Sequence, residues 1–229
     1  MMLRIVACAA IIASAGGCAA REVHPVGSPS PNPAAAAERL TRRSWPSGPR
    51  QATFAWTLDE AGERFRGRGV VRYQAPDRLR LDLFGPRGET LLAAALAGDT
   101  VRLPPAAQGQ FALPSAALLW GVLGVIRPPD GATPQAVLGA GADSTVRYSG
   151  TGGDTWEFRT GAAPLTRVQR SSRGGVAESV DITWATQDRI RTARYREWSA
   201  QRTLDLTFES ITNAEPFAPS IWLPQGTSR

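Results

Sequence analysis

Lysine is absent from this sequence, histidine occurs once, and cysteine occurs twice. The 26 basic residues are therefore all arginine, and with 20 acidic residues they give a formal charge of +6 at pH 7. The one histidine, His24, lies in a segment rich in proline and serine, which leaves a folded domain without an imidazole. The Ser-His-Asp triad and histidine-bound metal centres are excluded on this ground.

Sequence motifs of several common enzyme classes are missing as well. There is no G-x-S-x-G elbow, no phosphate-binding P-loop, and no G-x-G-x-x-G after a strand pattern. Carboxylates such as Asp82 and Glu89 are outnumbered by neighbouring arginines, which is typical of surface ion pairs rather than of catalytic acids. We therefore predict a protein that is not an enzyme, with no catalytic residue, no metal and no cofactor.

The excess of arginine gives a pI of about 10.5, which would suit a partner that carries phosphates. The arginines are scattered over many segments, however, and they do not cluster with aromatic residues that could stack on bases. Nucleic-acid binding is not predicted, because a protein that binds nucleic acid is expected to combine a cluster of basic residues with aromatic residues that stack on bases.

The two cysteines lie near the N-terminus, within a pattern that resembles a bacterial lipoprotein signal peptide. Arg4 precedes an apolar run over residues 5–15, and small residues then lead directly to Cys18. The resemblance implies that residues 1–17 are removed and that Cys18 carries the lipid that anchors the chain to a membrane. In Gram-negative bacteria, an Asp directly after the lipid-modified cysteine favours retention of a lipoprotein in the inner membrane. Ala19 occupies this position here, so we predict that the chain is anchored at the periplasmic face of the outer membrane. The alternative is an ordinary secretory signal with an incidental cysteine.

Residues 18–33 contain proline, serine, glycine and asparagine with little to bury, which predicts a flexible tether. Since Cys8 is removed with the signal peptide, Cys18 has no partner for an intramolecular disulfide. Residues 34–229 are predicted to form one domain, which begins with a short helix over residues 34–43.

Alternation with a period of two predicts antiparallel sheet between Phe65 and Leu103. Leu79, Leu81 and Leu83 alternate with polar residues after one turn, and an apolar run at residues 90–97 follows another. Further strands are predicted at residues 51–59, 145–149, 155–160, 165–171, 177–185, 189–198 and 202–211. The total is about eleven antiparallel strands.

Residues 114–126 are apolar around the whole circumference of a helix, so a helix at this place would be buried. A curled sheet of many strands leaves space inside, and we predict that this helix plugs or covers it. A plain core helix on a closed sheet is the equal alternative. Residues 133–138 are predicted as a second short helix.

Several motifs follow one another in a recognisable order: the lipid-modified Cys18, an initial helix, Phe54-Ala55-Trp56, the Phe65-x-Gly67 strand, the stretch from Ala75 to Leu81, and Phe84-Gly85-Pro86-x-Gly88. Together they resemble the LolA/LolB superfamily, and LolB most. The resemblance implies a mainly β fold, an unclosed antiparallel barrel with a helical lid, and an apolar cavity that accepts acyl chains. LolB is an outer-membrane lipoprotein that takes lipoproteins from a soluble LolA-like carrier and inserts them into the membrane.

One turn departs from the pattern of LolB. LolB has a bulky apolar residue on a projecting loop that inserts into the membrane, whereas the matching turn here contains Pro86 and Arg87. Arg87 can meet lipid phosphates but cannot embed in hydrocarbon. We therefore predict that Pro86 and Arg87 face the membrane, and the resemblance carries over the fold better than the insertion activity.

The leading hypothesis is a monomer that binds lipid acyl chains or lipoproteins inside the sheet. Small residues at Gly67 and Gly69, the number of strands and the apolar helix favour a cavity, and a packed core is the alternative. The predicted lining residues are Trp56, Phe65, Val71, Leu81, Leu83, Leu118, Leu119 and Leu123.

A second hypothesis is a structural or regulatory envelope lipoprotein. In this case the outer surface of the sheet binds a protein partner or an anionic glycolipid through its arginines. The residues concerned are Arg66, Arg68, Arg72 and Arg80.

Overall fold

A computed structural model describes residues 29–105 and 113–223 of the chain. One antiparallel sheet dominates it, with twelve strands in the order β5-β4-β3-β2-β1-β12-β11-β10-β9-β8-β7-β6. The two end strands do not pair with each other, so the sheet curls without closing. The mainly β, unclosed architecture is confirmed, with one strand more than the eleven predicted. The strands are β1 (Arg50–Glu60), β2 (Glu63–Gln74), β3 (Arg78–Phe84), β4 (Thr90–Ala97), β5 (Thr100–Arg102), β6 (Thr133–Ala140), β7 (Asp143–Ser149), β8 (Thr155–Arg159), β9 (Arg167–Ser172), β10 (Gly175–Thr186), β11 (Arg189–Glu197) and β12 (Arg202–Asn213).

The additional strand is β6, where the sequence predicts a short helix over residues 133–138. β6 pairs with β7 from Thr133 opposite Ser149 to Ala140 opposite Asp143, and this pairing overrides the local preference. Pro134 is tolerated because β6 is an edge strand, where a missing N–H breaks no ladder.

The described chain begins beside this edge strand. The backbone N–H of Ser30 donates to the carbonyl oxygen of Val137 in β6 at 2.8 Å, so the end of the predicted tether lies against the sheet. The predicted signal peptide, residues 1–17, and Cys18 lie outside the described residues. Within the described ranges, no helix combines the length and hydropathy that crossing a membrane requires.

The predicted N-terminal helix is confirmed as α1 (Pro33–Ser44). Asn32 caps it, since its Oδ1 accepts a hydrogen bond from the N–H of Ala35 at 3.0 Å, and Pro33 occupies the first turn, where no N–H is needed. The helix packs against β6. At its other end, the Ser44 hydroxyl accepts from the N–H of Ile126 at 2.8 Å, which ties α1 to the segment after α2.

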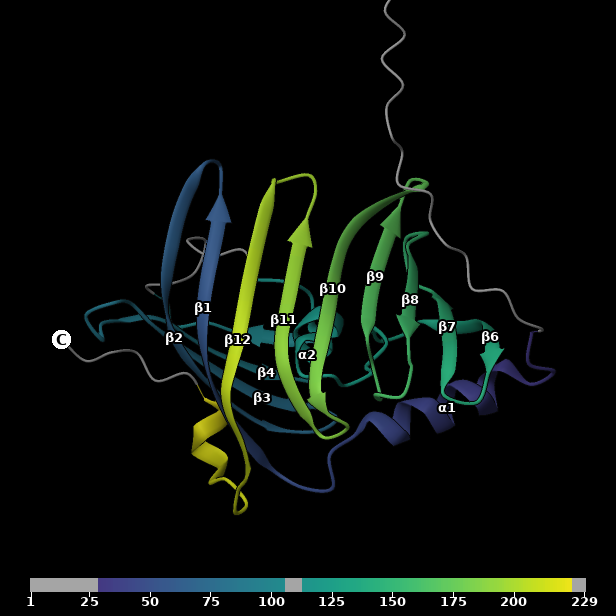
Figure 1. The fold of residues 1–229 in the computed structure, drawn as a ribbon, viewed down its shortest axis with the longest axis horizontal. Coiled ribbons are helices and arrows are strands. Elements are labelled where there is room, and N and C mark those ends of the chain that lie inside the picture. Colours follow the sequence, from purple (N-terminus) through teal and green to yellow (C-terminus); the bar gives the residue numbers. More distant parts are fainter. Residues whose placement is uncertain (1–28, 106–112, 224–229) are drawn as a thin grey trace, which may run out of the picture.

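The second helix, α2 (Ala116–Val122), lies behind β10 and β11, and β3 and β4 also pass behind the front strands (Figure 1). It is shorter than the predicted residues 114–126, because Gly124 takes a φ of 72° and turns the chain. Leu118 and Trp120 are completely buried, and the helix contacts β9, β10 and β11. The apolar helix therefore occupies the interior of the curled sheet.

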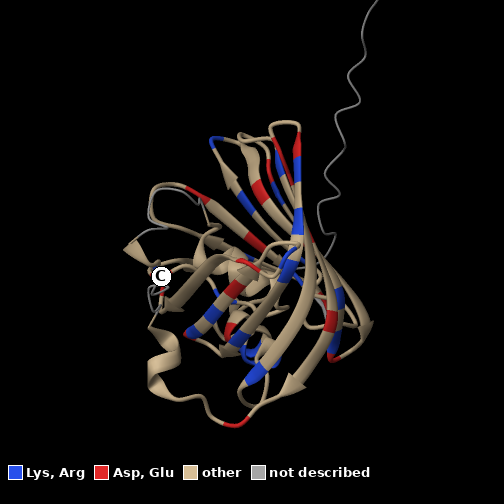
Figure 2. Ribbon diagram, turned by 90° about the vertical axis from the view of Figure 1, so that its left-hand side faces the viewer, with Lys and Arg blue, Asp and Glu red and all other residues tan. Residues whose placement is uncertain are grey.

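The two faces of the sheet differ in chemistry. On β1, Ala52, Phe54 and Trp56 are buried on the inner face, while intervening residues point outward. Acidic and basic positions alternate with other residues along the strands (Figure 2). Many of these charges are paired across strands, as Arg64 is with Asp59 at 2.6 Å and Arg72 with Asp82 at 3.0 Å. The exposed pair of Arg64 and Asp59 contributes little to stability, whereas Asp82 is buried and its pair with Arg72 is partly shielded from water.

The C-terminal segment docks on the same sheet through the 3-10 helix η2 (Pro219–Trp222). η2 contacts β3 and β4, and Trp222 is buried against the ring of Phe217. Arg80 donates to the carbonyl oxygens of Ile221 at 3.1 Å and Leu223 at 3.3 Å.

Arg127 connects three turns that lie far apart in the sequence. Its Nη1 donates to the carbonyl oxygen of Pro76 at 2.6 Å, and its Nη2 lies 2.8 Å from Asp99 and 3.5 Å from Asp130. The side chain of Arg127 is only 11% exposed, so these bonds are shielded from water. Partial burial raises the pKa of Asp99, but the N–H of Asp130 and the Arg127 guanidinium outweigh it, and the net pKa is lowered.

We expect Arg127→Ala to lower the free energy of unfolding by about 2–3 kcal/mol at pH 7, because it leaves partly buried acceptors without their donor. Since the pKa of folded Asp99 is lowered, its contribution is present above about pH 4 and is lost as the pH falls through the folded value. Urea unfolding at pH 7 and pH 3 measures this effect. The difference in the free energy of unfolding between wild type and variant should be smaller at pH 3 than at pH 7. Arg42→Ala, which removes an exposed pair with Glu38, is the control and should cost about 0.5 kcal/mol or less.

Candidate functional site

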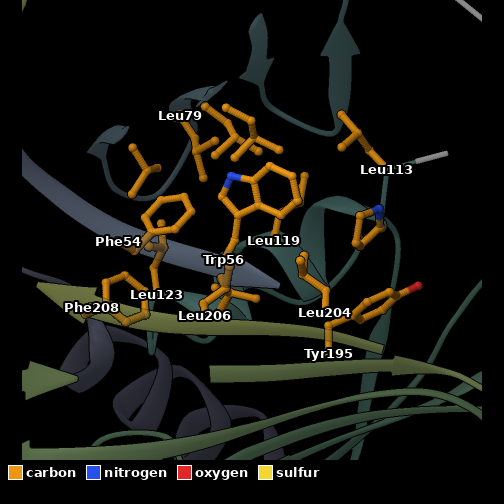
Figure 3. Close-up of a pocket in the computed structure, with 15 residues that line it drawn as sticks. Phe54, Trp56, Leu79, Leu113, Leu119, Leu123, Tyr195, Leu204, Leu206 and Phe208 are labelled. Atoms are coloured by element: carbon orange, nitrogen blue, oxygen red, sulfur yellow. The ribbon is translucent and has the colours of Figure 1, made fainter. Parts of the chain in front are cut away.

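An apolar cavity of about 80 Å³ lies between α2 and the inner face of the sheet (Figure 3). The side chains come from five strands, from α2 and from the segments flanking it. The lining residues are Phe54, Trp56, Val71, Leu79, Leu81, Leu83, Leu113, Pro114, Leu119, Val122, Leu123, Tyr195, Leu204, Leu206 and Phe208.

Two of the lining side chains carry a polar group, and both groups are occupied elsewhere. The indole Nε1 of Trp56 donates to the carbonyl oxygen of Arg68 at 2.9 Å. The hydroxyl of Tyr195 donates to Oε1 of Glu178 at 2.6 Å and points away from the leucines around it (Figure 3). The wall therefore presents carbon to an occupant, which suits a hydrocarbon chain and excludes recognition by side-chain hydrogen bonds.

Two glycines on β2 allow the aromatic side chains of β1 to lie over the sheet. Phe54 is paired with Gly69 and Trp56 with Gly67. A Cβ at Gly69 would overlap the Phe54 ring, and one at Gly67 would lie 2.7 Å from the Trp56 ring and overlap the carbonyl oxygen of Phe84. The Gly-x-Gly pattern of β2 is therefore required by the aromatic pair on β1.

Tyr195 belongs to a charged network beside the cavity. Glu178 is 7% exposed and accepts hydrogen bonds from Tyr195 and from Arg170, whose Nε lies 2.6 Å from Oε2. Arg202 pairs with Glu60 and Glu197 on the other side of Tyr195. Burial and the Glu178 carboxylate both raise the pKa of Tyr195, which stays protonated and keeps its role as a donor.

Six of the eight predicted lining residues lie in the cavity wall: Trp56, Val71, Leu81, Leu83, Leu119 and Leu123. Phe65 lies elsewhere, because it is near the β1–β2 turn, where the strand is uncovered and its side chain is 47% exposed. Leu118 is completely buried in the core and does not contribute to the wall.

Nine further lining residues are not predicted from the sequence. Leu204, Leu206 and Phe208 alternate with polar residues on β12, and this period-two signal placed them on one face of a strand. What was missing was the pairing of β12 with β1, which brings that face beside Trp56. Leu79 belongs to the alternating run of β3, and Phe54 and Tyr195 carried no signal that distinguishes a wall from a core. The others are Leu113, Pro114 and Val122, which flank or belong to α2.

The turn predicted to face the membrane joins β3 and β4. Pro86 and Arg87 are both exposed, and the Arg87 N–H donates to Oε2 of Glu89 at 2.9 Å. Leu91, at the register shift where β4 begins, is an exposed apolar residue next to this turn.

Gly67→Ala tests the close approach of β1 and β2. We expect a loss of about 1–3 kcal/mol in the free energy of unfolding, because Trp56 and the Phe84 carbonyl must both move. Gly48→Ala is the matched control, since no atom lies within 4 Å of its added Cβ. Urea unfolding of both variants measures the effect, and equal stabilities would show that the glycine is not required.

No family model matches the sequence, and no curated protein matches it. Solved structures nevertheless share its fold. A LolA superfamily protein from Nitrosomonas europaea has a TM-score of 0.52 at 10% identity, over 79% of this chain and 94% of that one. A putative outer membrane lipoprotein-sorting protein domain from Vibrio parahaemolyticus has a TM-score of 0.56 at 11% identity, over 81% and 94%.

A DUF1329 family protein from Desulfovibrio piger has a TM-score of 0.54 at 8% identity, over 83% of this chain and 97% of that one. At identities this low, the likeness concerns the fold alone. None of the three is described as a LolB protein, so the resemblance to LolB stays a prediction. The open antiparallel sheet of this chain is thus a fold that it shares with LolA-superfamily and lipoprotein-sorting structures.

Proposed function

We propose that this protein binds the acyl chains of lipids or lipoproteins in its apolar cavity and catalyses no reaction. The observation that carries the proposal is the cavity wall, in which both polar side-chain groups are already hydrogen-bonded to the protein. The fold shared with a lipoprotein-sorting domain supports the same function.

The volume of the cavity implies that binding changes its shape. About 80 Å³ is well below the roughly 300–1,000 Å³ typical of ligand pockets, so a long acyl chain requires a wider space. Leu119 and Val122 of α2, together with Leu123 directly after it, make up this side of the wall, and α2 is a helix of seven residues. Movement of α2 away from β1 and β12 is the route by which the cavity would widen, and the ligand would favour that open state.

In this proposal the protein is an envelope lipoprotein with a LolB-like role. Residues 1–17 are the signal peptide, Cys18 carries the lipid, and residues 34–229 are a monomeric binding domain. The tether of residues 18–33 connects the domain to the periplasmic face of the outer membrane, although its end at Ser30 is bonded to β6. A LolA-like carrier would deliver the lipoprotein.

The arrangement of the arginines favours the cavity over the outer surface as the functional site. Arg80 and Arg72 both bond to Asp82, and Arg80 also holds the C-terminal segment. Arg68 is exposed but lies 3.7 Å from Glu209. Three of the four arginines of the second hypothesis therefore lie beside a carboxylate, and both signs of charge occur along the strands (Figure 2).

Leu119 provides a test of the cavity with two opposite substitutions. Leu119→Trp fills the space, and we expect at least a tenfold loss of affinity for a fluorescent fatty-acid probe. Leu119→Ala enlarges it, so affinity should be kept or increased while the free energy of unfolding falls by about 2–3 kcal/mol.

Leu91→Trp is the control for Leu119, because it places the same large side chain at an exposed position outside the cavity. It should leave probe affinity within twofold of wild type. Unchanged affinity in a folded Leu119→Trp variant would show that acyl chains do not enter this cavity.

Cys18→Ser tests the anchor independently of the cavity. We expect the variant to lose incorporation of labelled palmitate and to leave the membrane fraction, since the lipid chains supply the anchoring free energy. The control is Cys8→Ser, which changes a residue of the predicted signal peptide and should keep both properties. Membrane association of an unlabelled Cys18→Ser protein would contradict the anchor.

A further inference from the structure

A second pocket, of about 200 Å³, adjoins the apolar cavity on the other side of Leu123. Leu123 lines both spaces. The second pocket has apolar lining from Val125 and Ile190, and Trp45 and Trp184 contribute aromatic rings. It differs from the apolar cavity because charged side chains also line it.

Arg50, the first residue of β1, brings a positive charge into this pocket. Its Nε atom is buried and has no hydrogen-bond partner within the described residues. A buried donor without an acceptor costs about 1–3 kcal/mol, and more when the group is charged, so native structures rarely leave one. An acceptor on a bound ligand would remove this cost.

The surrounding charges favour an anion. Arg43 lines the same pocket, and Arg189 lines the adjoining one together with Arg50. Asp188 is the acidic residue among those that line these two pockets; it is exposed, and its Oδ1 already accepts from the hydroxyl of Thr186 at 2.7 Å. Tyr73 lines the pocket as well, and burial raises its pKa more than the neighbouring Arg50 guanidinium, which is hydrogen-bonded to the phenol, lowers it. The neutral phenol therefore adds no negative charge, and the Nε of Arg50 is still without a partner within the described residues. Three arginines and one carboxylate thus line the two adjoining pockets.

We propose that this pocket holds the anionic head group, a carboxylate or a phosphate, of a ligand whose acyl chain occupies the adjoining apolar cavity. The inference rests on the proposed function. A guanidinium group binds either anion with two parallel hydrogen bonds, and Arg50 has its Nε available for one of them. The apolar lining beside Leu123 accommodates the first methylenes of the chain.

Calorimetric titration with three ligands of equal chain length tests the head-group site. Decanoate and decyl phosphate carry an anion, whereas decanol does not. We expect the wild-type protein at low salt to bind the better of the two anionic ligands at least fivefold more tightly than decanol. Arg50→Gln should remove this preference and leave the affinity for decanol within twofold. The comparison of decanoate with decyl phosphate shows which anion the pocket selects.

Arg68→Gln is the matched control, since it removes one positive charge from neighbouring β2 at a side chain that is 78% exposed and outside the pocket. Arg68→Gln should keep the preference for the anion.

Arg43→Gln, at the C-terminal end of α1, should reduce the preference for the anion by about twofold to threefold. This variant is used in place of Arg50→Gln if Arg50→Gln does not fold.

The outcomes separate the inference from the function on which it rests. Equal wild-type affinity for all three ligands would overturn the head-group site while supporting the acyl-chain cavity. A preference that persists in folded Arg50→Gln, or in Arg43→Gln where that variant is used, would also overturn it. If the wild-type protein binds none of the three ligands, the proposed function fails together with the inference.

Discussion

Phe54 and Trp56 on β1 lie directly opposite Gly69 and Gly67 on β2, and the interior of the sheet depends on this pairing. A side chain at either glycine would collide with the ring facing it. Because the glycines leave the inner face of β2 open, the rings can lie across it, and the sheet can bend strongly toward β3 and β4, which pass behind the front strands (Figure 1). That bend creates the space that α2 fills.

The position of α2 results from apolar packing more than from directional bonds. Leu118 and Trp120 are completely buried, and Trp120 meets the ring of Tyr73 edge to face at 6.3 Å. The indole Nε1 of Trp120, however, is buried with no partner within the described residues. Such a group costs about 1–3 kcal/mol, which lowers the cost of any movement that lets it reach an acceptor. This property fits a helix that must move if the proposed ligand is to enter.

The alternating patterns on β1, β2, β3 and β12 predict the sheet and most of its inner face, because period two is a local property of the chain. The cavity required more information. Leu206 is recognisable as inward-facing, but its place beside Trp56 follows from the pairing of β12 with β1, which are about 150 residues apart in the sequence. Phe65 shows the converse error: it has the correct alternation but lies where no other element covers the strand, so it is exposed.

Local reasoning also failed at β6 and at the ends of α2. The local sequence over residues 133–138 predicts a short helix, but its pairing with β7 makes the segment a strand. Gly124 ends α2 early, although the apolar pattern continues to Ile126, because the chain must turn back at this point to reach Ser44. In both cases a tertiary contact overrides a pattern that the sequence shows plainly.

A small cavity is compatible with the proposed transfer of acyl chains, because the largest contribution to the free energy, the burial of the chain, is nearly the same in the cavity and in the membrane. Each methylene that leaves water gains about 0.8 kcal/mol, whether it enters a protein cavity or a bilayer. When an acyl chain passes between the cavity and the bilayer, the direction of transfer is therefore set by smaller free-energy contributions of a few kcal/mol. Displacing α2 from the sheet opposes entry into the cavity, and an anion bonded to the unpartnered Nε of Arg50 would favour it. In this proposal the direction of transfer therefore depends on two of the buried donors that have no partner within the described residues, those of Trp120 and Arg50, more than on the leucines of the wall.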